Sequence, residues 1–532
     1  MKIKQLQKRI WDANTPSAHI SLNEVKSSYM FIKSLNNRAD MRPRISRWRM
    51  MISILEVAER AHTGTRLEDR EWGMGLFRKL QQLIARHRLT RKAPDKFYEV
   101  DNDYADSLFQ AAVDLLVETG VFSTQTHRVI IFTEDEVRQA LRETPSEVTM
   151  GRGPERRTWY KRDFEDSKPA GISVAGHGPW SDKMIPLPIV VRELVRHRRV
   201  DMIEGFMYAN IDGHEVNGPA LRAYAARRAL DRVRDGLTMA GRGGLAITNY
   251  PVLTDAFSLV APLDAERGLR RGDGGFFTIL PDLMVEEDLI AAAIVYQEMG
   301  CYCLSGGRGN GPWGGGPDGE IVESTAGAIA QWMIYGDTLL DATGGFSASN
   351  YSGRKAEAAA PTSKPTRDSG GGLNWQSFAQ RKALNRNTNH IFYIGPWGGN
   401  RIYYDMTSEQ YLLKVALSSI ESTITGLNMR VGATNPPTHT SWIVETSDAA
   451  IKSGTSLEDF AELYERVNRE KLSDYTEQST QDQRMHIYGD DPMKFLAAGL
   501  KAYDWYKQAP TDDYLKIERK ARNYLRDIGL KI

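Results

Sequence analysis

Short apolar segments alternate with amphipathic helical segments between residues 171 and 433. Helical patterns lie between most of these apolar segments, Glu320–Leu340 among them, and no dinucleotide-binding glycine fingerprint follows the first segment. Strands that alternate with helices over this length favour an α/β fold of the (β/α)8 TIM barrel class over an open doubly wound sheet. The predicted strands are Gly171–Ala175, Met202–Tyr208, Leu245–Ile247, Phe276–Leu280, Cys301–Ser305, Gly345–Ser349, Ile391–Gly395 and Met429–Ala433.

Helical patterns continue on both sides of the predicted barrel. We expect an Arg-rich N-terminal helical extension (1–65), a helical cap segment (66–165), the barrel (166–440) and C-terminal helices packed on it (441–532). In the cap, Asp103–Thr119 places its apolar residues on one helical face. Thr133 is followed three residues later by Glu136, which predicts a capping box at the start of another helix.

Composition narrows the function classes. The chain has 532 residues, 41% hydrophobic and 26% charged, with a formal net charge of +1. These values are typical of globular proteins and give no electrostatic case for nucleic acid or an anionic membrane as partner. No run approaches the ~18 apolar residues of a membrane span, and the N-terminus lacks the apolar core of a secretory signal. We therefore expect a cytoplasmic protein.

The metal-ligating residue types show no spacing typical of a metal site. Ten histidines are scattered along the chain, and the two cysteines, Cys301 and Cys303, share one face of a predicted strand. Core packing in a reducing compartment is the expected role of these cysteines. A glycine-rich run contains G-x-G-x-x-G from Gly309 to Gly314, but Pro312 removes an amide donor and no Lys-Ser/Thr follows. A wide loop is favoured there over a nucleotide site.

The residues just after each strand form the functional face of a TIM barrel. The segment Leu237–Pro251, LTMAGRGGLAITNYP, predicts a helix end, a glycine turn, a short strand and the polar exit Thr248-Asn249-Tyr250. The predicted exits are rich in glycine, asparagine and aromatic residues, poor in carboxylates, and contain one histidine, His177. We expect His177 to contact ligand or to relay a proton, and a structural role in a turn remains the alternative.

Aromatic and basic residues near the predicted strand ends are the candidates for substrate binding. Aromatic faces attract methylated ammonium groups, and arginine pairs a carboxylate through two hydrogen bonds. Packing in a lid or core is the alternative role for the aromatic residues, as is a solvated surface for the arginines. The predicted substrate-binding residues are Asn249, Tyr250, Arg308, Trp313, Tyr351, Trp397, Asn400 and Arg401.

Several collinear blocks resemble the monomethylamine methyltransferase family, the corrinoid-linked barrel enzymes of methylotrophic methanogens. The resemblance covers roughly residues 65–532 and is loose from about 252 to 425. It implies a TIM barrel, a homo-oligomer, and a separate corrinoid (cobalamin) protein as methyl acceptor, with no cofactor bound tightly by this chain. The blocks include DSLFQAAVDLLVETGVFSTQTHR and FTEDEV (106–137), SKPAGISVAGHGPWSDKMIPLP (167–188), VDMIEGFMYANIDG (200–213), MAGRGGLAI (239–247) and APTDDYLKIERKARNYLRDIGL (509–530).

The resemblance does not bring the family's active site with it. The family carries pyrrolysine, an imine electrophile that captures the amine, after the third strand, where this chain has Thr248. Its two glutamates beyond the fourth and fifth strands correspond to Phe276–Phe277 and Leu304–Gly307, and its glutamine after the seventh strand to Asn400 or Arg401. This chain therefore resembles a homologue without pyrrolysine.

A threonine hydroxyl cannot act as the imine does, whereas a quaternary ammonium or sulfonium donor needs no such electrophile because its leaving group departs neutral. By analogy with trimethylamine methyltransferase relatives that lack pyrrolysine and resemble betaine demethylases, we expect a corrinoid-dependent methyltransferase for a quaternary or otherwise pre-activated methylated amine. The alternatives are a catalytically degenerate barrel that acts as a scaffold or binding protein, and a barrel enzyme of unrelated chemistry.

Overall fold

The computed structural model describes most of the chain between residues 53 and 532. The described residues are 53–90, 98–175, 179–181, 185–205, 207–249, 255–305, 309–310, 316–336, 339–341, 346–347, 375–394, 407–432, 436–473 and 501–532. They belong to one compact unit, Met50–Ile532. Of the predicted N-terminal extension, residues 1–52 lie outside the described ranges, and the predicted domain boundaries stay predictions.

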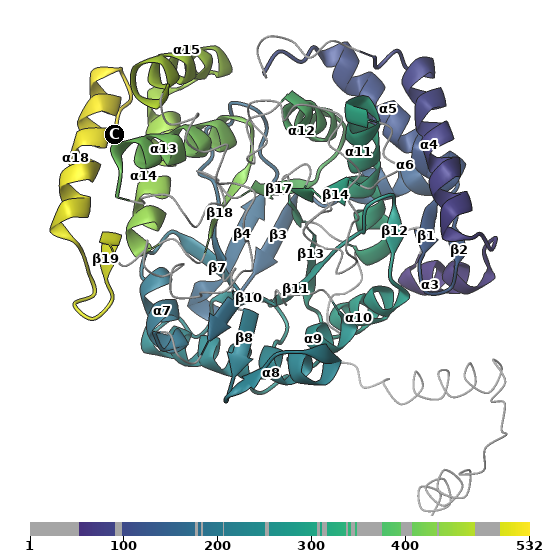
Figure 1. The fold of residues 1–532 in the computed structure, drawn as a ribbon, viewed down its shortest axis with the longest axis horizontal. Helices are drawn as coiled ribbons and strands as arrows, with labels where there is room; N and C mark the ends of the chain where they lie inside the picture. Colours follow the sequence, from purple (N-terminus) through teal and green to yellow (C-terminus); the bar gives the residue numbers. More distant parts are fainter. Residues whose placement is uncertain are drawn as a thin grey trace, which may run out of the picture. The chain divides into compact units, whose positions relative to one another are not determined.

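A closed barrel of eight parallel strands forms the centre of this unit (Figure 1). Each strand pairs with the next along the chain, and the last pairs with the first. The strands are β5 (Ile172–Ala175), β7 (Val200–Glu204), β10 (Ala246–Asn249), β11 (Gly274–Phe277), β13 (Tyr302–Ser305), β15 (Leu339–Asp341), β17 (Ile391–Ile394) and β18 (Asn428–Gly432). This confirms the predicted TIM barrel.

A helix follows each barrel strand before the next one begins, and these helices surround the ring of strands (Figure 1). The alternation explains the sequence pattern, because a buried parallel strand is apolar throughout whereas its covering helix is apolar on one face only. The helices are α7 (Leu187–Leu194), α8 (Gly218–Met239), α9 (Ala256–Val260), α10 (Glu287–Glu298), α11 (Gly316–Tyr335), α12 (Trp375–Asn387), α13 (Glu409–Ile424) and α14 (Pro437–Ser453).

Further helices flank the barrel on two sides. Before the barrel, α3 (Ile54–Thr63), α4 (Asp69–Arg86), α5 (Asn102–Thr119) and α6 (Glu134–Glu143) pack against α11, and α5 also packs against α12. The predicted capping box of α6 is confirmed, since Thr133 and Glu136 each accept the other's backbone N–H. After the barrel, α15 (Leu457–Val467) and α18 (Asp512–Asp527) pack against α13. None of the helices in the described ranges is both long and apolar enough to span a bilayer.

Short accessory strands pair outside the barrel. Four of them each come directly after a barrel strand in the chain and form two parallel pairs, β6 with β8 and β14 with β16. Another, β12, runs beside β1 in a small sheet completed by β2. These strands are β1 (Val121–Ser123), β2 (Arg128–Ile130), β6 (Pro179–Ser181), β8 (Met207–Ile211), β9 (His214–Glu215), β12 (Met284–Val285), β14 (Gly309–Asn310) and β16 (Phe346–Ser347).

A hairpin of β3 (Glu147–Met150) and β4 (Arg157–Tyr160) closes the amino-terminal end of the barrel. In Figure 1 both strands lie over the centre of the ring. Their apolar residues, Trp159 among them, join the side chains that fill the barrel interior. The Trp159 indole donates to Asp201 at 2.9 Å, and the N–H of Gly151 donates to the carbonyl of Gly272. The hairpin is therefore fixed to the segments that lead into the strands.

The sixth barrel strand was predicted at the wrong place. The predicted strand Gly345–Ser349 contains β16, which pairs with β14 outside the barrel, and the barrel strand is β15. The predicted helix Glu320–Leu340 overlapped β15. Gly336 has a φ of +67°, and α11 ends just before it. A left-handed glycine is a common helix terminator, so apolar residues beyond it belong to a new element.

Candidate active site

Two consecutive polar residues of β10 point to opposite sides of the barrel wall, because side chains alternate along a strand. Thr248 faces the interior and is fully buried. Its hydroxyl lies 2.7 Å from the Tyr302 hydroxyl, and both oxygens lie within 3.8 Å of the Met202 sulfur. The predicted strand Leu245–Ile247 was too short, since both Thr248 and Asn249 belong to β10 rather than to its exit.

Gly274 makes this contact between β10 and β13 geometrically possible. These two strands are not neighbours, because β11 lies between them, and Gly274 stands between Thr248 and Tyr302 in the strand register. A Cβ on Gly274 would lie 2.1 Å from the Tyr302 ring. The Tyr302 side chain therefore crosses β11 where that strand has no side chain of its own.

Asn249 has a different role from the substrate contact predicted for it. Its side-chain amide donates to the backbone carbonyls of Ser258 and Leu259, at 3.0 and 3.3 Å, and to the Tyr296 hydroxyl at 3.4 Å. These partners belong to α9 and α10, on the outside of the barrel. The Tyr296 ring packs over Gly275, as the Tyr302 ring packs over Gly274 on the inside. Asn249 therefore joins the barrel wall to its helices.

A buried ion pair crosses the barrel interior. Glu204 ends β7 and Arg430 lies on β18, and both side chains are almost completely buried. One Glu204 carboxylate oxygen accepts from the Arg430 Nε at 2.9 Å, and the other accepts from the Ser173 hydroxyl at 3.0 Å. Because these residues come from the first, second and last strands, the network spans the seam at which the barrel closes.

Two aromatic rings inside the barrel already face a cation. The Arg430 guanidinium lies 5.7 Å from the centre of the Phe276 ring and 5.6 Å from that of the Tyr393 ring. Both rings are buried among the interior side chains. This is the cation–π arrangement that sequence reasoning assigned to substrate, with an arginine of the chain itself as the cation.

Sequence reasoning missed Glu204 and Arg430. The predicted second strand ran to Tyr208, which hid a carboxylate at the true strand end and made the strand exits look poor in acids. The strand ends at Glu204, and the next backbone N–H, of Gly205, donates to the carbonyl of Thr248. The signal was present nonetheless: the β7 and β18 segments carry charges of opposite sign among apolar residues, which indicates a buried pair.

The remaining candidates stay predictions, because they lie outside the described ranges. They are His177, Tyr250, Arg308, Trp313, Tyr351, Trp397, Asn400 and Arg401. Within the described ranges, no group of three or more His, Cys, Asp or Glu side chains is placed to hold a metal ion.

Burial raises the pKa of Tyr302, so its hydroxyl stays protonated and can donate at physiological pH.

Glu323 of α11 is a buried acid next to the turn that follows β11. Its carboxyl accepts the backbone N–H of Asp282 at 2.6 Å. Burial, and then the Asp282 carboxylate, raise the pKa of Glu323 to about 8. The turn is strained, since Asp282 and Leu283 have φ values of +61° and +49°. The Trp72 indole holds the same turn by donating to the carbonyl of Asp282 at 2.8 Å.

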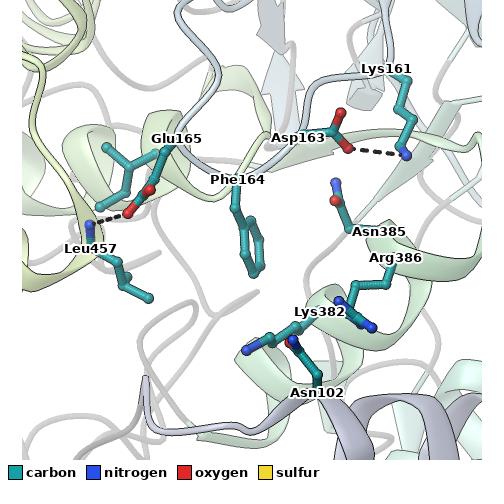
Figure 2. A pocket seen from close by; sticks show the side chains of 10 residues that line it. Asn102, Lys161, Asp163, Phe164, Glu165, Lys382, Asn385, Arg386 and Leu457 are labelled. Atoms are coloured by element: carbon teal, nitrogen blue, oxygen red, sulfur yellow. Dashed lines mark hydrogen bonds and ion pairs between the residues drawn. The ribbon is translucent and has the colours of Figure 1, made fainter.

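A surface cavity of about 420 Å³ lies near the amino-terminal end of the barrel, beside the segments that lead into β5, β17 and β18. Figure 2 shows the side chains that line it. It is lined by Asn102, Lys161, Asp163, Phe164, Glu165, Lys382, Asn385, Arg386, Ile424 and Leu457. Its charged groups have partners: Lys161 pairs with Asp163 at 3.1 Å, Glu165 accepts the N–H of Leu457, and Arg386 pairs with a carboxylate of α5. It shares no residue with the interior described above.

Comparison with known proteins gives consistent results. Residues 52–344 match the family model of monomethylamine methyltransferase MtmB. MtmB of Methanosarcina mazei and MtmB2 of Methanosarcina acetivorans are each 24% identical over 240 residues, which cover 45% of this chain and 52% of the relative. The chain thus spans about half the length of the curated relatives it matches.

The fold likeness extends further along the chain. Crystal structures of Methanosarcina barkeri MtmB and of a hydroxylamine MtmB complex each give a TM-score of 0.68 at 18% identity, covering 91% of this chain and 100% of the other. At that identity the match shows the shared fold. The family model, in contrast, matches more than half of the sequence. The chain therefore belongs to the monomethylamine methyltransferase MtmB family.

Proposed function

We propose that this chain transfers a methyl group from a small methylated amine to a corrinoid carried by a separate protein. Membership of the MtmB family and the closed barrel support this proposal. The corrinoid protein, a homo-oligomeric assembly and a cytoplasmic location belong to the same proposal. The corrinoid is a second substrate here, and the residues of this chain would bind and orient the methyl donor.

The donor class follows from position 248. By its resemblance to the family, Thr248 stands where relatives carry pyrrolysine, and its hydroxyl is engaged with Tyr302 at 2.7 Å. Two hydroxyl groups cannot form a covalent adduct with an amine. This observation carries the proposal that the donor is already activated, as a quaternary ammonium or a sulfonium compound.

The chemistry of such a donor balances without an electrophile. The bond between the methyl carbon and nitrogen breaks with its electron pair left on nitrogen, and the departing amine is neutral. The acceptor supplies the electron pair of the new bond to the methyl carbon. The chain therefore has to align the donor and exclude water, which are positioning effects of a closed site.

The cation of the donor needs aromatic faces other than those of Phe276 and Tyr393, which Arg430 occupies. We assign this role to the predicted residues Tyr250, Trp313, Tyr351 and Trp397. A carboxylate on the donor would pair with Arg308 or Arg401, and Asn400 and His177 would make polar contacts. These assignments rest on the positions of the residues near the predicted strand ends.

The test uses chemically reduced cob(I)alamin as acceptor and follows its absorbance spectrum as methyl–cobalt forms. The donors are mono-, di- and trimethylamine, tetramethylammonium, glycine betaine and a dimethylsulfonium compound. We expect methyl transfer from the last three and none from mono- or dimethylamine. Equal rates with monomethylamine would overturn the assigned donor class. No transfer from any donor would overturn the methyltransferase proposal and leave the scaffold interpretation.

A further inference from the structure

We propose that Tyr302 determines the size of the methyl donor by limiting how deep it reaches into the barrel. This inference rests on the proposed function, since it assigns a specificity-determining residue to that site. The argument starts from the position of the ring. Tyr302 lies at the start of β13, yet its hydroxyl meets Thr248 two strands away. A side chain in that position spans part of the barrel interior.

Gly274 on β11 leaves the space that the Tyr302 ring occupies against the barrel wall. Atoms of the Tyr302 ring lie 2.1 to 2.5 Å from where a Cβ of Gly274 would stand, so the ring lies directly against the backbone of β11. Any side chain there would displace the ring. Met202 contacts the hydroxyl from the other side, with its sulfur 3.7 Å away. The ring is therefore held at one place by three neighbouring strands.

Tyr302 is less buried than the interior side chains around it. Thr248, Met202, Phe276 and Leu304 surround it and are at most 1% exposed, whereas Tyr302 itself keeps accessible surface. Side chains deep in a well-packed interior normally leave no such surface. The accessible part of the ring is the surface that a ligand reaching this depth would touch.

The ring also occupies the volume beside residue 248. A long side chain at that position would collide with Tyr302, so the chain accommodates a short residue there. The polar pair of Thr248 and Tyr302 then forms the end of the donor site, and the donor extends from this pair toward the carboxyl ends of the strands. A smaller residue at 302 should let bulkier ammonium groups in.

The experiment compares two ammonium ions of different size. Dissociation constants of tetramethylammonium and tetraethylammonium are measured by calorimetry for the wild-type chain, Tyr302→Ala and Tyr302→Phe. We expect the wild type to favour tetramethylammonium, Tyr302→Ala to shift the preference toward the larger ion about tenfold, and Tyr302→Phe to keep it. Tyr296→Phe is the matched control, because it removes the hydroxyl of a tyrosine on α10 whose ring packs against Gly275 on the outer face of β11.

The outcomes separate this inference from the proposed function. If Tyr302→Ala folds, as judged by circular dichroism, and keeps the wild-type preference, the assignment of Tyr302 is wrong. If it does not fold, Tyr302→Leu takes its place with the same criterion. If the wild type binds neither ion, the inference is overturned. If the preference shifts as expected while no donor transfers a methyl group to cob(I)alamin, the donor site stands and the proposed reaction fails.

Discussion

The hydroxyl groups of Thr248 and Tyr302 meet at 2.7 Å inside the barrel although their strands, β10 and β13, are separated by β11. The contact is polar in a mostly apolar interior, where an unmade hydrogen bond costs more than it does at the surface. It therefore fixes the side chain at position 248 as well as the ring that crosses to it.

Replacing Thr248 by valine should destabilise the fold. Valine keeps the shape but removes the partner of the Tyr302 hydroxyl, which leaves a buried polar group and costs about 1–2 kcal/mol. Urea unfolding followed by circular dichroism measures the change. Thr248→Ser keeps the hydroxyl and should retain most of the stability, and a valine variant as stable as the wild type would contradict the role given to this hydrogen bond.

Gly274→Ala should also destabilise the protein, because the added methyl group collides with the Tyr302 ring. Overpacking of this kind costs about 1–3 kcal/mol. The control is Gly243→Ala, where nothing lies within 4 Å of the added carbon. Combined with Tyr302→Ala, the Gly274 change should become nearly neutral. Additive effects in this double-mutant cycle would show that the two residues do not interact.

Arg430→Met should cost more than either of these changes. It leaves the Glu204 carboxylate buried without its cation, and breaking such a pair costs about 3–5 kcal/mol. The double variant with Glu204→Gln should regain much of the loss, since it removes the uncompensated charge. Arg138→Met, which breaks an exposed helical ion pair with Glu134, should cost less than about 1 kcal/mol. Thermal unfolding of the wild type, Arg430→Met, the double variant and Arg138→Met provides the comparison.

Glu323 should make the protein less stable as pH rises. Its pKa in the folded state is about 8, above the ordinary 4.5, so the folded state holds a proton that the unfolded chain releases. Stability contributed by this group is therefore lost between pH 4.5 and 8, by up to about 1.4 kcal/mol per pH unit. Glu323→Gln should flatten that slope in denaturant titrations across this range, and the exposed Glu462→Gln should not. An unchanged slope would contradict the raised pKa.

The barrel could be predicted from the sequence because hydrophobic periodicity is a local property of each segment. The eight βα repeats and the Thr133 capping box follow from such local signals, and seven of the strands overlap the predicted segments. The sixth did not, because its apolar residues continued the pattern of α11 beyond Gly336. Strand ends were harder to predict, since Glu204 at the end of β7 pairs with the Arg430 guanidinium, which lies 226 residues away in the chain.

The contacts of the site were beyond sequence reasoning for the same reason. Thr248 was identified as the decisive position, but its partner Tyr302 lies in another repeat and contacts it only because Gly274 intervenes. Asn249 looked equivalent to Thr248 because the two are consecutive and polar. The alternation of side chains across a strand separates them, and applying that rule required knowing that β10 continues to Asn249.

The hairpin of β3 and β4 has a consequence for the order of events during turnover. Because Trp159 and its neighbours close the amino-terminal end of the barrel, the donor and the acceptor of the proposed reaction would both have to approach from the carboxyl-terminal ends of the strands. A small donor can pass first, but not once a protein covers the opening. Methyl transfer should therefore follow a compulsory sequence in which the donor binds before the corrinoid protein and the demethylated amine leaves after it. Excess corrinoid protein would then slow turnover, because it would cover the barrel of chains that have not yet bound a donor.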